Sequence, residues 1–210
     1  MADLNQMSEM VQKGNHQEVA RLTQEALDES LPVKEILEQG LIAGMAVVGE
    51  RFKKNEVFVP EVLLAARAMK AGMALLKPIL AETGAEPVAT VVLGTVKGDQ
   101  HDIGKNLVGM MLEGAGFEVF DLGVSVEPEK FVEAAKEKKA QLIAMSALLT
   151  TTMPNMAKTI EALKGAGIDA KTMIGGAPVT QGFADEIQAD GYGDNGSRAV
   201  EKAKELIGKK

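Results

Sequence analysis

Residues 88–106, "VATVVLGTVKGDQHDIGKN", decide the fold of this 210-residue chain. Residues 88–96 form a β-branched apolar run without a helical period, which is typical of a strand buried in a parallel sheet. The run ends in a turn that places His101, one of 2 histidines in the chain, between Asp99 and Asp102. A buried strand that leads through a polar turn into a helix predicts the first βα unit of an α/β domain.

Strand and helix patterns alternate from this segment to the C-terminus. A helix over 105–114 follows the first strand, and further strands are predicted within 117–123, 141–149 and 170–176 and near Gly191. The helices between and after them are predicted over 127–139, 153–167 and 183–188 and from Asn195 onward. Five strands that alternate with helices predict a flavodoxin- or Rossmann-like doubly wound parallel sheet.

The first 80 residues show only helical patterns. Asn15 is a candidate N-cap, and a helix is predicted within 33–56 after Pro32. Pro60 opens another helix, apolar on nearly every side, which predicts that this helix is buried. The sequence therefore predicts a helical-bundle cap domain over 1–86 and a Rossmann-like domain over 87–210, joined by turn-forming residues at 84–87.

Composition excludes several classes of function. A net charge of −7 argues against nucleic acid as a partner, because duplex binding needs clustered Lys and Arg. The chain has no cysteine, so it forms neither disulfides nor cysteine-ligated clusters. The N-terminus lacks the apolar stretch of a signal peptide, and no run approaches the ~18 apolar residues of a membrane span. We expect a cytoplasmic protein that does not bind membranes.

His101 lies on the loop after the first strand, at the sheet edge where α/β proteins bind ligands. Three interpretations stay open from the residues alone. His101 is a surface histidine beside acidic helix-capping residues, a general base oriented by Asp99, or a metal ligand whose other ring nitrogen is held by Asp99. One histidine is too few for a zinc site built by protein alone. It suffices for a metal already held by a macrocycle, such as cobalt in a corrin ring.

Two other predicted strand ends carry polar or small residues. The third strand ends in "MSALLTTTM", with Ser146 and Thr150–Thr152 supplying hydroxyl groups, and the fourth ends at Gly175 and Gly176. The alternative interpretations are that Thr152 caps the following helix and that the two glycines only form a turn. Because carboxyl ends of parallel strands meet at one edge, the three strand ends predict a single site.

The spacing of these residues resembles a known signature. Asp99-x-His101-x-x-Gly104, followed after 41 residues by Ser146-x-Leu148 and after 26 more by Gly175-Gly176, is similar to the cobalamin-binding signature. It is shared by the corrinoid (cobalamin-binding) proteins of methyltransferase systems and by cobalamin-dependent methionine synthase. Residues 45–78 also resemble the helical cap that precedes the cobalamin-binding module in these proteins.

The resemblance implies that cobalamin binds base-off/His-on, with His101 as the axial cobalt ligand. Asp99 then holds the His101 ring, and Thr152 continues this relay in the place of a serine. Further implied cofactor contacts are Gln100, Asp102, Ile103, Gly104, Ser146, Leu148, Thr150, Gly175 and Gly176, with Gly191 and Tyr192 at the fifth strand end. Phe52, Phe58, Val59 and Val62 are implied to cover the methyl-bearing face, Phe58 and Val62 lying on one surface. The alternative is that these four form bundle core.

The resemblance further implies a methyl carrier rather than a stand-alone enzyme. Its cofactor, cobalamin or a related corrinoid, alternates between methylcobalamin and cob(I)alamin, that is, methyl–Co(III) and Co(I). The implied partners are a substrate:corrinoid methyltransferase, a methyl-corrinoid:acceptor methyltransferase that uses tetrahydrofolate or a thiol, and a reductive activase. The cap must move aside for each partner, so we expect rearrangement at 84–87.

Three other functions compete with the methyl carrier. A cobalamin-dependent sensor that represses transcription needs a DNA-binding segment ahead of the cap. The cobalamin domain of a radical mutase needs a catalytic barrel, and the chain contains no such barrel. A flavodoxin-like module without corrin stays colourless when it is purified with cobalamin, whereas a corrinoid protein turns red or orange.

Overall fold

The computed structural model describes residues 3–83 and 87–208, with the side chains of 81–83 left out. The chain divides into two compact units, Met1–Pro87 with Gly114–Gly116 and Val88–Glu113 with Phe117–Lys210. The linker predicted at 84–87 lies mostly outside the described residues, and only its last residue, Pro87, is described, as exposed.

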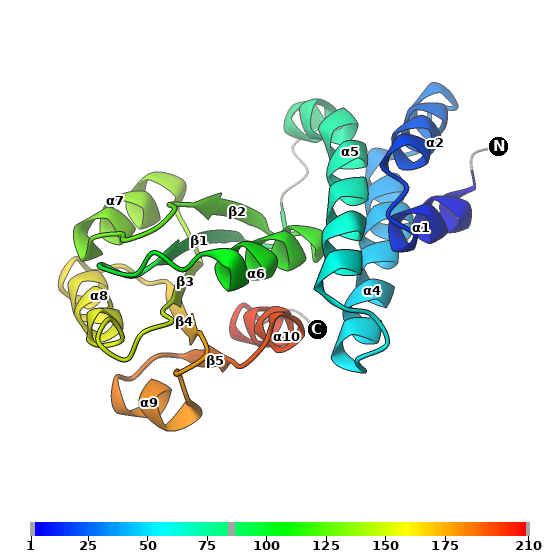
Figure 1. Cartoon of the computed structure of the whole chain (residues 1–210). Coiled ribbons are helices and arrows are strands. Elements are labelled where there is room, and N and C mark those ends of the chain that lie inside the picture. Colours follow the sequence, from blue (N-terminus) through cyan, green and yellow to red (C-terminus); the bar gives the residue numbers. More distant parts are fainter. Residues whose placement is uncertain (1–2, 84–86, 209–210) are drawn as a thin grey trace. The chain divides into compact units, whose positions relative to one another are not determined.

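The second unit is built on a five-stranded parallel sheet, as the sequence predicts. Its strands are β1 (Thr90–Thr95), β2 (Glu118–Asp121), β3 (Leu142–Ser146), β4 (Lys171–Gly175) and β5 (Gly191–Gly193). They lie in the order β2-β1-β3-β4-β5 (Figure 1), and every neighbouring pair is parallel. This order, with a switch between β1 and β3, confirms the flavodoxin-like doubly wound sheet.

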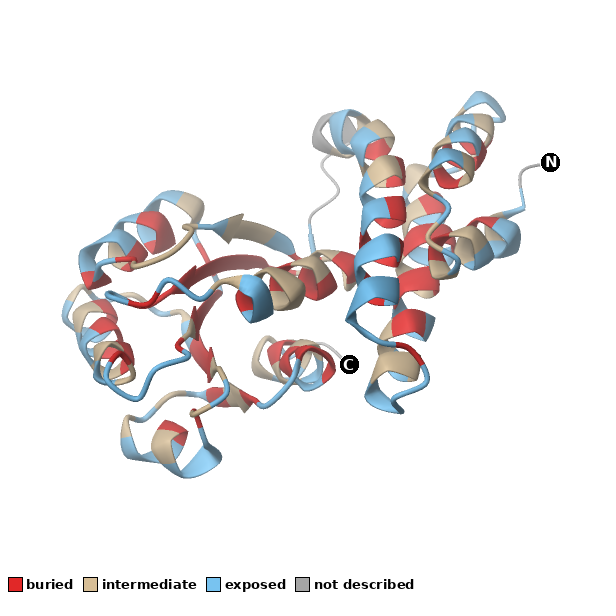
Figure 2. Ribbon diagram, in the orientation of Figure 1, coloured by how far each residue is buried: buried red, intermediate tan, exposed pale blue. Residues whose placement is uncertain are grey.

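Five helices cover the two faces of this sheet. They are α6 (Ile103–Gly114), α7 (Pro128–Lys138), α8 (Pro154–Gly165), α9 (Gln181–Glu186) and α10 (Gly196–Leu206). Helices α7 and α8 lie side by side over one face, and α6 and α10 over the other (Figure 1). Every residue of β1 is buried (Figure 2), as expected for a central strand covered on both faces.

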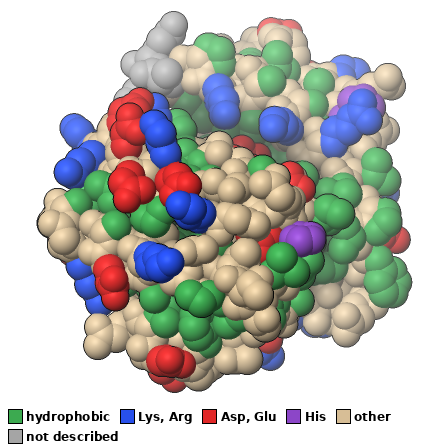
Figure 3. Space-filling view, turned by 60° about the vertical axis from the view of Figure 1, so that its left-hand side comes forward, with side chains coloured by type: hydrophobic (Ala, Val, Ile, Leu, Met, Phe, Trp, Pro, Cys, Tyr) green, Lys and Arg blue, Asp and Glu red, His purple; other side chains and the backbone are tan. Residues whose placement is uncertain are grey.

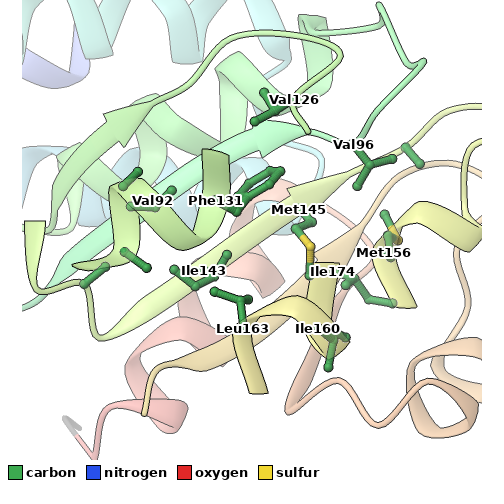
Figure 4. Close-up of a cluster of buried hydrophobic side chains, with 14 of the residues drawn as sticks. Val92, Val96, Val126, Phe131, Ile143, Met145, Met156, Ile160, Leu163 and Ile174 are labelled. Carbon is green, nitrogen blue, oxygen red and sulfur yellow. The ribbon is translucent and has the colours of Figure 1, made fainter. Parts of the chain in front are cut away.

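The buried core between the sheet and the α7–α8 layer consists of aliphatic and methionine side chains around the ring of Phe131. Phe131 of α7 packs against β1, where a Cβ on Gly94 would come within 2.9 Å of the ring. Strand residues at every second position face this layer. The cluster (Figure 4) includes Val92, Val96, Ile143, Met145 and Ile174 from the strands and their ends and Met156, Ile160 and Leu163 from α8.

The first unit is helical throughout its described residues. Its elements are α1 (Leu4–Gln12), α2 (His16–Asp28), α3 (Val33–Glu35), the π-helix η1 (Ile36–Ile42), α4 (Ala43–Lys53) and α5 (Val59–Thr83). The prediction of Asn15 as an N-cap is confirmed, because its side-chain oxygen accepts the N–H of Glu18 at 3.2 Å. No helix among the described residues is long and apolar enough to cross a membrane.

Helix α5 is not buried on every side, so that sequence prediction is wrong. Val62, Ala65 and Met69 are buried and form a stripe at helical spacing, whereas Leu63 and Leu64 are 38% and 51% exposed. The sequence pattern misled because the two leucines of the first turns lie on the outer face, whereas the smaller Val62 and Ala65 lie on the inner face.

Two glycines four residues apart bring α1 close to the helix that runs from η1 into α4. A Cβ on Gly40 would lie 2.5 Å from Sδ of Met7, and a Cβ on Gly44 would lie 2.7 Å from the carbonyl oxygen of Ser8. A methyl group at Gly44 would therefore push against backbone, which cannot move aside as a flexible side chain can.

We predict that Gly44→Ala destabilises the helical unit by about 1–3 kcal/mol, the cost of overpacking a closed contact. The matched control is Gly49→Ala in the same helix, where a Cβ meets nothing within 4 Å. Because alanine favours helix over glycine, Gly49→Ala should be neutral or stabilising by up to about 1 kcal/mol. Urea unfolding followed by circular dichroism measures both. Equal stability of the two variants would contradict the close contact.

Candidate functional site

The carboxylate of Asp99 is the centre of the candidate site. It lies in the turn after β1, at the carboxyl edge of the sheet, and its side chain is fully buried. The turn closes through the N–H of Asp99, which donates to the carbonyl of Val96 at 3.0 Å. Gly98 has a φ of +81°, a conformation that glycine adopts without strain.

Donors from two loops surround this carboxylate. Oδ1 accepts the backbone N–H of His101 at 3.0 Å and lies 3.0 Å from Nδ1 of the His101 ring. Oδ2 accepts the N–H groups of Leu148 at 2.8 Å and Leu149 at 3.2 Å. It also accepts the hydroxyl of Thr152 at 2.7 Å. The turn after β1 and the loop after β3 are thus joined through one carboxylate.

These donors keep Asp99 ionised despite its burial. Burial by itself raises the pKa of the Asp99 carboxyl, because the charged form loses its water. The hydrogen bonds from Thr152, from the backbone of His101 and Leu148 and from the His101 ring oppose this effect and outweigh it. The pKa of Asp99 therefore lies well below its ordinary value, and Asp99 is a fixed negative charge beside the ring.

The His101 ring is held on one side and open on the other. Its side chain is 47% exposed, although the Asp99 side chain that it contacts is fully buried. If Nδ1 carries the proton that Asp99 accepts, Nε2 keeps the lone pair that binds metals. Three exposed apolar side chains lie on the same segments: Ile103, which begins α6, is 83% exposed, and Leu148 and Leu149 in the loop after β3 are each 42% exposed.

The alternative that Thr152 caps the next helix is wrong. The N-cap of α8 is Met153, which makes no side-chain capping bond. The Thr152 hydroxyl instead lies between Oδ2 of Asp99 and the carbonyl oxygen of Leu149, 2.8 Å away. Thr152 is buried, and its hydroxyl bonds to the Asp99 carboxylate instead of capping α8.

The other residues predicted after β1 lie around His101 without bonding to Asp99. Gln100 and Gly104 are exposed, and Asp102 is half-buried. Asp102 accepts the side-chain amide of Asn106 at 3.1 Å in the first turn of α6. A Cβ on Gly104 would meet nothing within 4 Å, so packing within the chain does not require glycine there.

Ser146, Gly175 and Gly176 lie at the same sheet edge, and Thr150 is exposed in the loop after β3. Ser146 and Gly175 end β3 and β4 and are paired in register. Gly176 has a φ of +129°, and a Cβ there would lie 1.9 Å from the carbonyl oxygen of Ala147. The backbone itself therefore requires glycine at Gly176.

The prediction that Gly191 and Tyr192 lie at the ligand-facing end of the fifth strand needs correction for Gly191. Gly191 begins β5 and pairs in register with Met173, the middle residue of β4, so it lies short of the carboxyl edge of the sheet. A Cβ on Gly191 would lie 2.8 Å from Lys202 of α10, so its lack of a side chain serves helix packing. The strand ends at Gly193, which is level with Gly175 and which the sequence analysis missed.

The four residues predicted as a lid belong to the helical unit and differ in burial. Val62 is fully buried, Phe52 is half-buried, and Phe58 and Val59 are 61% and 37% exposed. The expectation that Phe58 and Val62 share one surface is wrong. Phe58 directly precedes α5, donates its N–H to the carboxylate of Glu61 at 3.1 Å and is 61% exposed, whereas Val62 is fully buried.

Comparisons with known proteins agree with this fold and show the family of the chain. A model described as B12 binding domain matches residues 89–201, and a second B12 binding domain model matches residues 3–77. The chain therefore belongs to the B12-binding family. A corrinoid protein of Desulfitobacterium hafniense (strain Y51) is 42% identical over 214 residues, which cover 100% of this chain and 99% of that protein.

Two further relatives of this B12-binding chain are informative. Trimethylamine corrinoid protein 2 of Methanosarcina acetivorans is 50% identical over 195 residues, with 89% of each chain covered. The solved methanol:cobalamin methyltransferase complex MtaBC of Methanosarcina barkeri contains a similar chain, with a TM-score of 0.86 and 30% identity. That match covers 96% of this chain and 78% of the other.

The donor set of this B12-binding chain fits a metal that a macrocycle already holds. Among the described residues, no group of three or more His, Cys, Asp and Glu side chains could hold a metal ion. A single imidazole with one nitrogen fixed by a carboxylate suits one axial position only. The exposed apolar side chains beside it suit contact with the apolar parts of such a macrocycle, such as its methyl groups.

The sequence analysis missed several residues around the site. Leu149 donates its N–H to Asp99, a backbone contribution that no side-chain pattern reveals. Lys105 is buried in the first turn of α6 and forms an ion pair with Asp121 at the end of β2. The position of Lys105 directly after the Asp99–Gly104 signature was the available signal. Buried lysines normally have a charged partner, so this ion pair could have been expected.

We predict that Thr152→Val lowers the free energy of unfolding by about 1–3 kcal/mol, because a charged buried acceptor loses a donor. The pKa of Asp99 should also rise toward its ordinary value of 3.8. A lowered pKa contributes stability that is complete above the unfolded value and is lost as the pH falls through the folded value. The variant should therefore lose less stability on acidification than the wild type.

The measurement is urea unfolding of the cofactor-free chain at a series of pH values from neutral to strongly acidic. The matched control is Thr151→Val, which changes the exposed neighbouring threonine in the same loop and should leave the acid dependence unchanged. Parallel pH profiles for Thr152→Val and the wild type would contradict the assignment of Thr152 as a donor to a charged Asp99.

Proposed function

We propose that this chain binds a corrinoid base-off/His-on, with His101 as the axial cobalt ligand, and carries a methyl group between two methyltransferases. One observation carries the proposal: a half-exposed imidazole whose Nδ1 is fixed by a buried, ionised carboxylate. The relatives, which include a trimethylamine and a dimethylamine corrinoid protein, support the binding of a corrinoid and the carrier role. When bound, the cobalt supplies the centre that takes up the methyl group and gives it up again.

His101 and Asp99 then act as one unit. Hydrogen bonding of Nδ1–H to Asp99 fixes the tautomer and aims Nε2 as the ligand atom, and it makes that atom more basic. The fixed charge of Asp99 would lie beside the ring both with and without a metal bound at Nε2. Thr152 holds the Asp99 carboxylate in place during both states. The hydrogen bonds from His101 and Thr152 to Asp99 thereby fix the orientation of the ligand atom.

Further residues bind the cofactor and exclude water. Ile103, Leu148 and Leu149 present apolar surface beside His101 and would pack against apolar parts of the cofactor. We assign the remaining contacts to Gln100, Asp102, Gly104, Ser146, Thr150, Gly175, Gly176 and Tyr192. In the helical domain, which we take to be residues 1–86, exposed Phe58 and Val59 with half-buried Phe52 would cover the methyl-bearing face. Buried Val62 would support them from the core.

The proposed partners are the enzymes on either side of the methyl transfer. A substrate:corrinoid methyltransferase loads the methyl group, and a second methyltransferase passes it to tetrahydrofolate or a thiol. A reductive activase restores the reactive cobalt state. Each partner needs access to the covered face, so the proposal includes uncovering of that face for each transfer.

We predict that His101→Ala removes the nitrogen ligand from bound cobalt. With the chain reconstituted with cob(II)alamin, the paramagnetic resonance spectrum should show splitting by one axial nitrogen. Uniform ¹⁵N labelling of histidine should change that splitting from three lines to two, which identifies the nitrogen as protein-derived. In His101→Ala the labelled splitting should disappear.

The matched control is His16→Ala, which removes the other of the 2 histidines from the start of α2. It should leave the spectrum unchanged. A spectrum of the wild type that does not respond to histidine labelling would show that no histidine nitrogen binds the cobalt, and the His-on proposal would then be wrong.

We predict that the reduced, corrinoid-loaded chain accepts one methyl group when it is mixed with a matching methyl donor and its methyltransferase. Purified methyltransferases for trimethylamine, dimethylamine and methanol form the panel, and the visible spectrum reports methylation of the cobalt. Addition of a thiol-methylating partner should reverse the spectral change. A chain that binds cobalamin yet is methylated by no member of the panel would favour the sensor hypothesis, which a DNA gel shift in dark and light would then test.

A further inference from the structure

We propose that Thr95 and Ser125 are positioning residues that fix the Asp99–His101 pair from the side opposite to Leu148 and Thr152. The inference rests on the proposed ligation of cobalt by His101 and names two residues that control it. Neither belongs to the signature that spans Asp99 to Gly176, and neither bonds to the Asp99 carboxylate. They act instead on the backbone that carries it.

Thr95 closes the turn that presents Asp99. It is the last residue of β1 and is fully buried. Its hydroxyl donates to the main-chain carbonyl of Asp99 at 2.6 Å and accepts the N–H of Ser125 at 2.8 Å. One hydroxyl therefore joins the end of the central strand, the turn and the loop after β2.

Ser125 completes the connection from the loop between β2 and α7. Its N–H also approaches the carbonyl of Asp99, at 2.9 Å, and its hydroxyl accepts the N–H of Gly98 at 2.9 Å. Its φ of +52° lies in the left-handed region, which non-glycine residues adopt only at a cost. The hydrogen bonds to Thr95, Gly98 and Asp99 offset this cost and explain why the loop adopts the conformation.

Asp99 is thus held at both ends. Leu148, Leu149 and Thr152 hold its carboxylate, whereas Thr95 and Ser125 hold its main chain. If the main-chain side is released, the carboxylate stays bound to the β3 loop, while the turn that leads to His101 can shift. The hydrogen bond between Oδ1 of Asp99 and Nδ1 of His101 then no longer holds the ring in one orientation, so the direction of Nε2 varies.

The turn that carries Asp99 is also held by contacts that do not involve Thr95 or the Asp99 carboxylate. The side chain of Asn155 in α8 donates to the carbonyl of Lys97 at 2.9 Å, so the middle of the same turn is fixed by a third segment. Lys97 itself pairs with Glu127 at 3.0 Å, at the far end of the Ser125 loop. Removal of the Thr95 hydroxyl should therefore loosen the turn without unfolding it.

The test compares Thr95→Val and Ser125→Ala with two controls. Thr95→Ser keeps the hydroxyl and should restore the wild-type behaviour. Thr172→Val removes another buried strand threonine of the same unit, whose hydroxyl also makes two bonds: it donates to Asp190 at 2.9 Å and accepts the Asp190 N–H at 3.2 Å. Thr172 lies near the start of β4, at the opposite edge of the sheet, so it reports loss of stability alone.

The readout is the ratio of histidine-bound to histidine-free cob(II)alamin in ¹⁵N-histidine-labelled chains, measured by paramagnetic resonance. We expect this ratio to fall roughly three- to tenfold in Thr95→Val, the change that corresponds to the loss of one hydrogen bond. Ser125→Ala should lower it in the same direction. Thr95→Ser and Thr172→Val should keep the wild-type ratio, although Thr172→Val should melt at a lower temperature.

The possible outcomes separate the two proposals. If the wild type shows no labelled histidine nitrogen, the ligation by His101 fails and the positioning role fails with it. If the wild type shows it and both Thr95→Val and Ser125→Ala keep the wild-type ratio, only the positioning role is wrong. Should Thr95→Val fail to fold or to bind cobalamin, Ser125→Ala decides. A decrease in Thr172→Val equal to that in Thr95→Val would attribute the effect to general instability and would overturn the inference.

Discussion

The site depends on one buried charge. A carboxylate without contact to water is costly unless donors surround it, and Asp99 is stable only because separate segments supply those donors. The bonds from His101, Leu148, Leu149 and Thr152 fix the two loops relative to each other. The orientation of the His101 ring is a consequence of this arrangement, since its Nδ1 is aimed at the same carboxylate.

The register of the parallel sheet brings these segments together, because it places the ends of their strands at the same level. Thr95 pairs in register with Ser146, and Ser146 pairs with Gly175, so the ends of β1, β3 and β4 are level. Loops that leave level strand ends meet at one edge of the sheet, which is where α/β proteins bind ligands. On the face of the molecule in Figure 3, acidic and basic side chains are interspersed, in keeping with a net charge of −7 and the absence of a basic patch on that face.

The helical unit follows a different principle, close packing of backbones. Gly40 and Gly44 let α1 approach η1 and α4, and they lie within or just after a π-helical segment that no pattern in the sequence indicated. Apart from Val47 in α4, its exposed large apolar residues lie just before or within the first turns of α5 and outside the buried stripe of that helix: Phe58, Val59, Leu63 and Leu64. The helical period alone therefore predicts the buried positions of α5 poorly, because large apolar residues lie on both faces of this helix.

The sequence by itself determined the order of elements, the parallel sheet and the strand ends that carry the site, because β-branched runs and helical periods depend on neighbouring residues only. It also identified Asp99, His101 and Thr152 as candidates. Only the tertiary structure decided that Thr152 bonds to Asp99 rather than capping α8, that Gly191 packs against α10, and that Val62 is buried while Phe58 is exposed. Each of these depends on which residue from another element lies opposite, and local patterns carry no information about that partner.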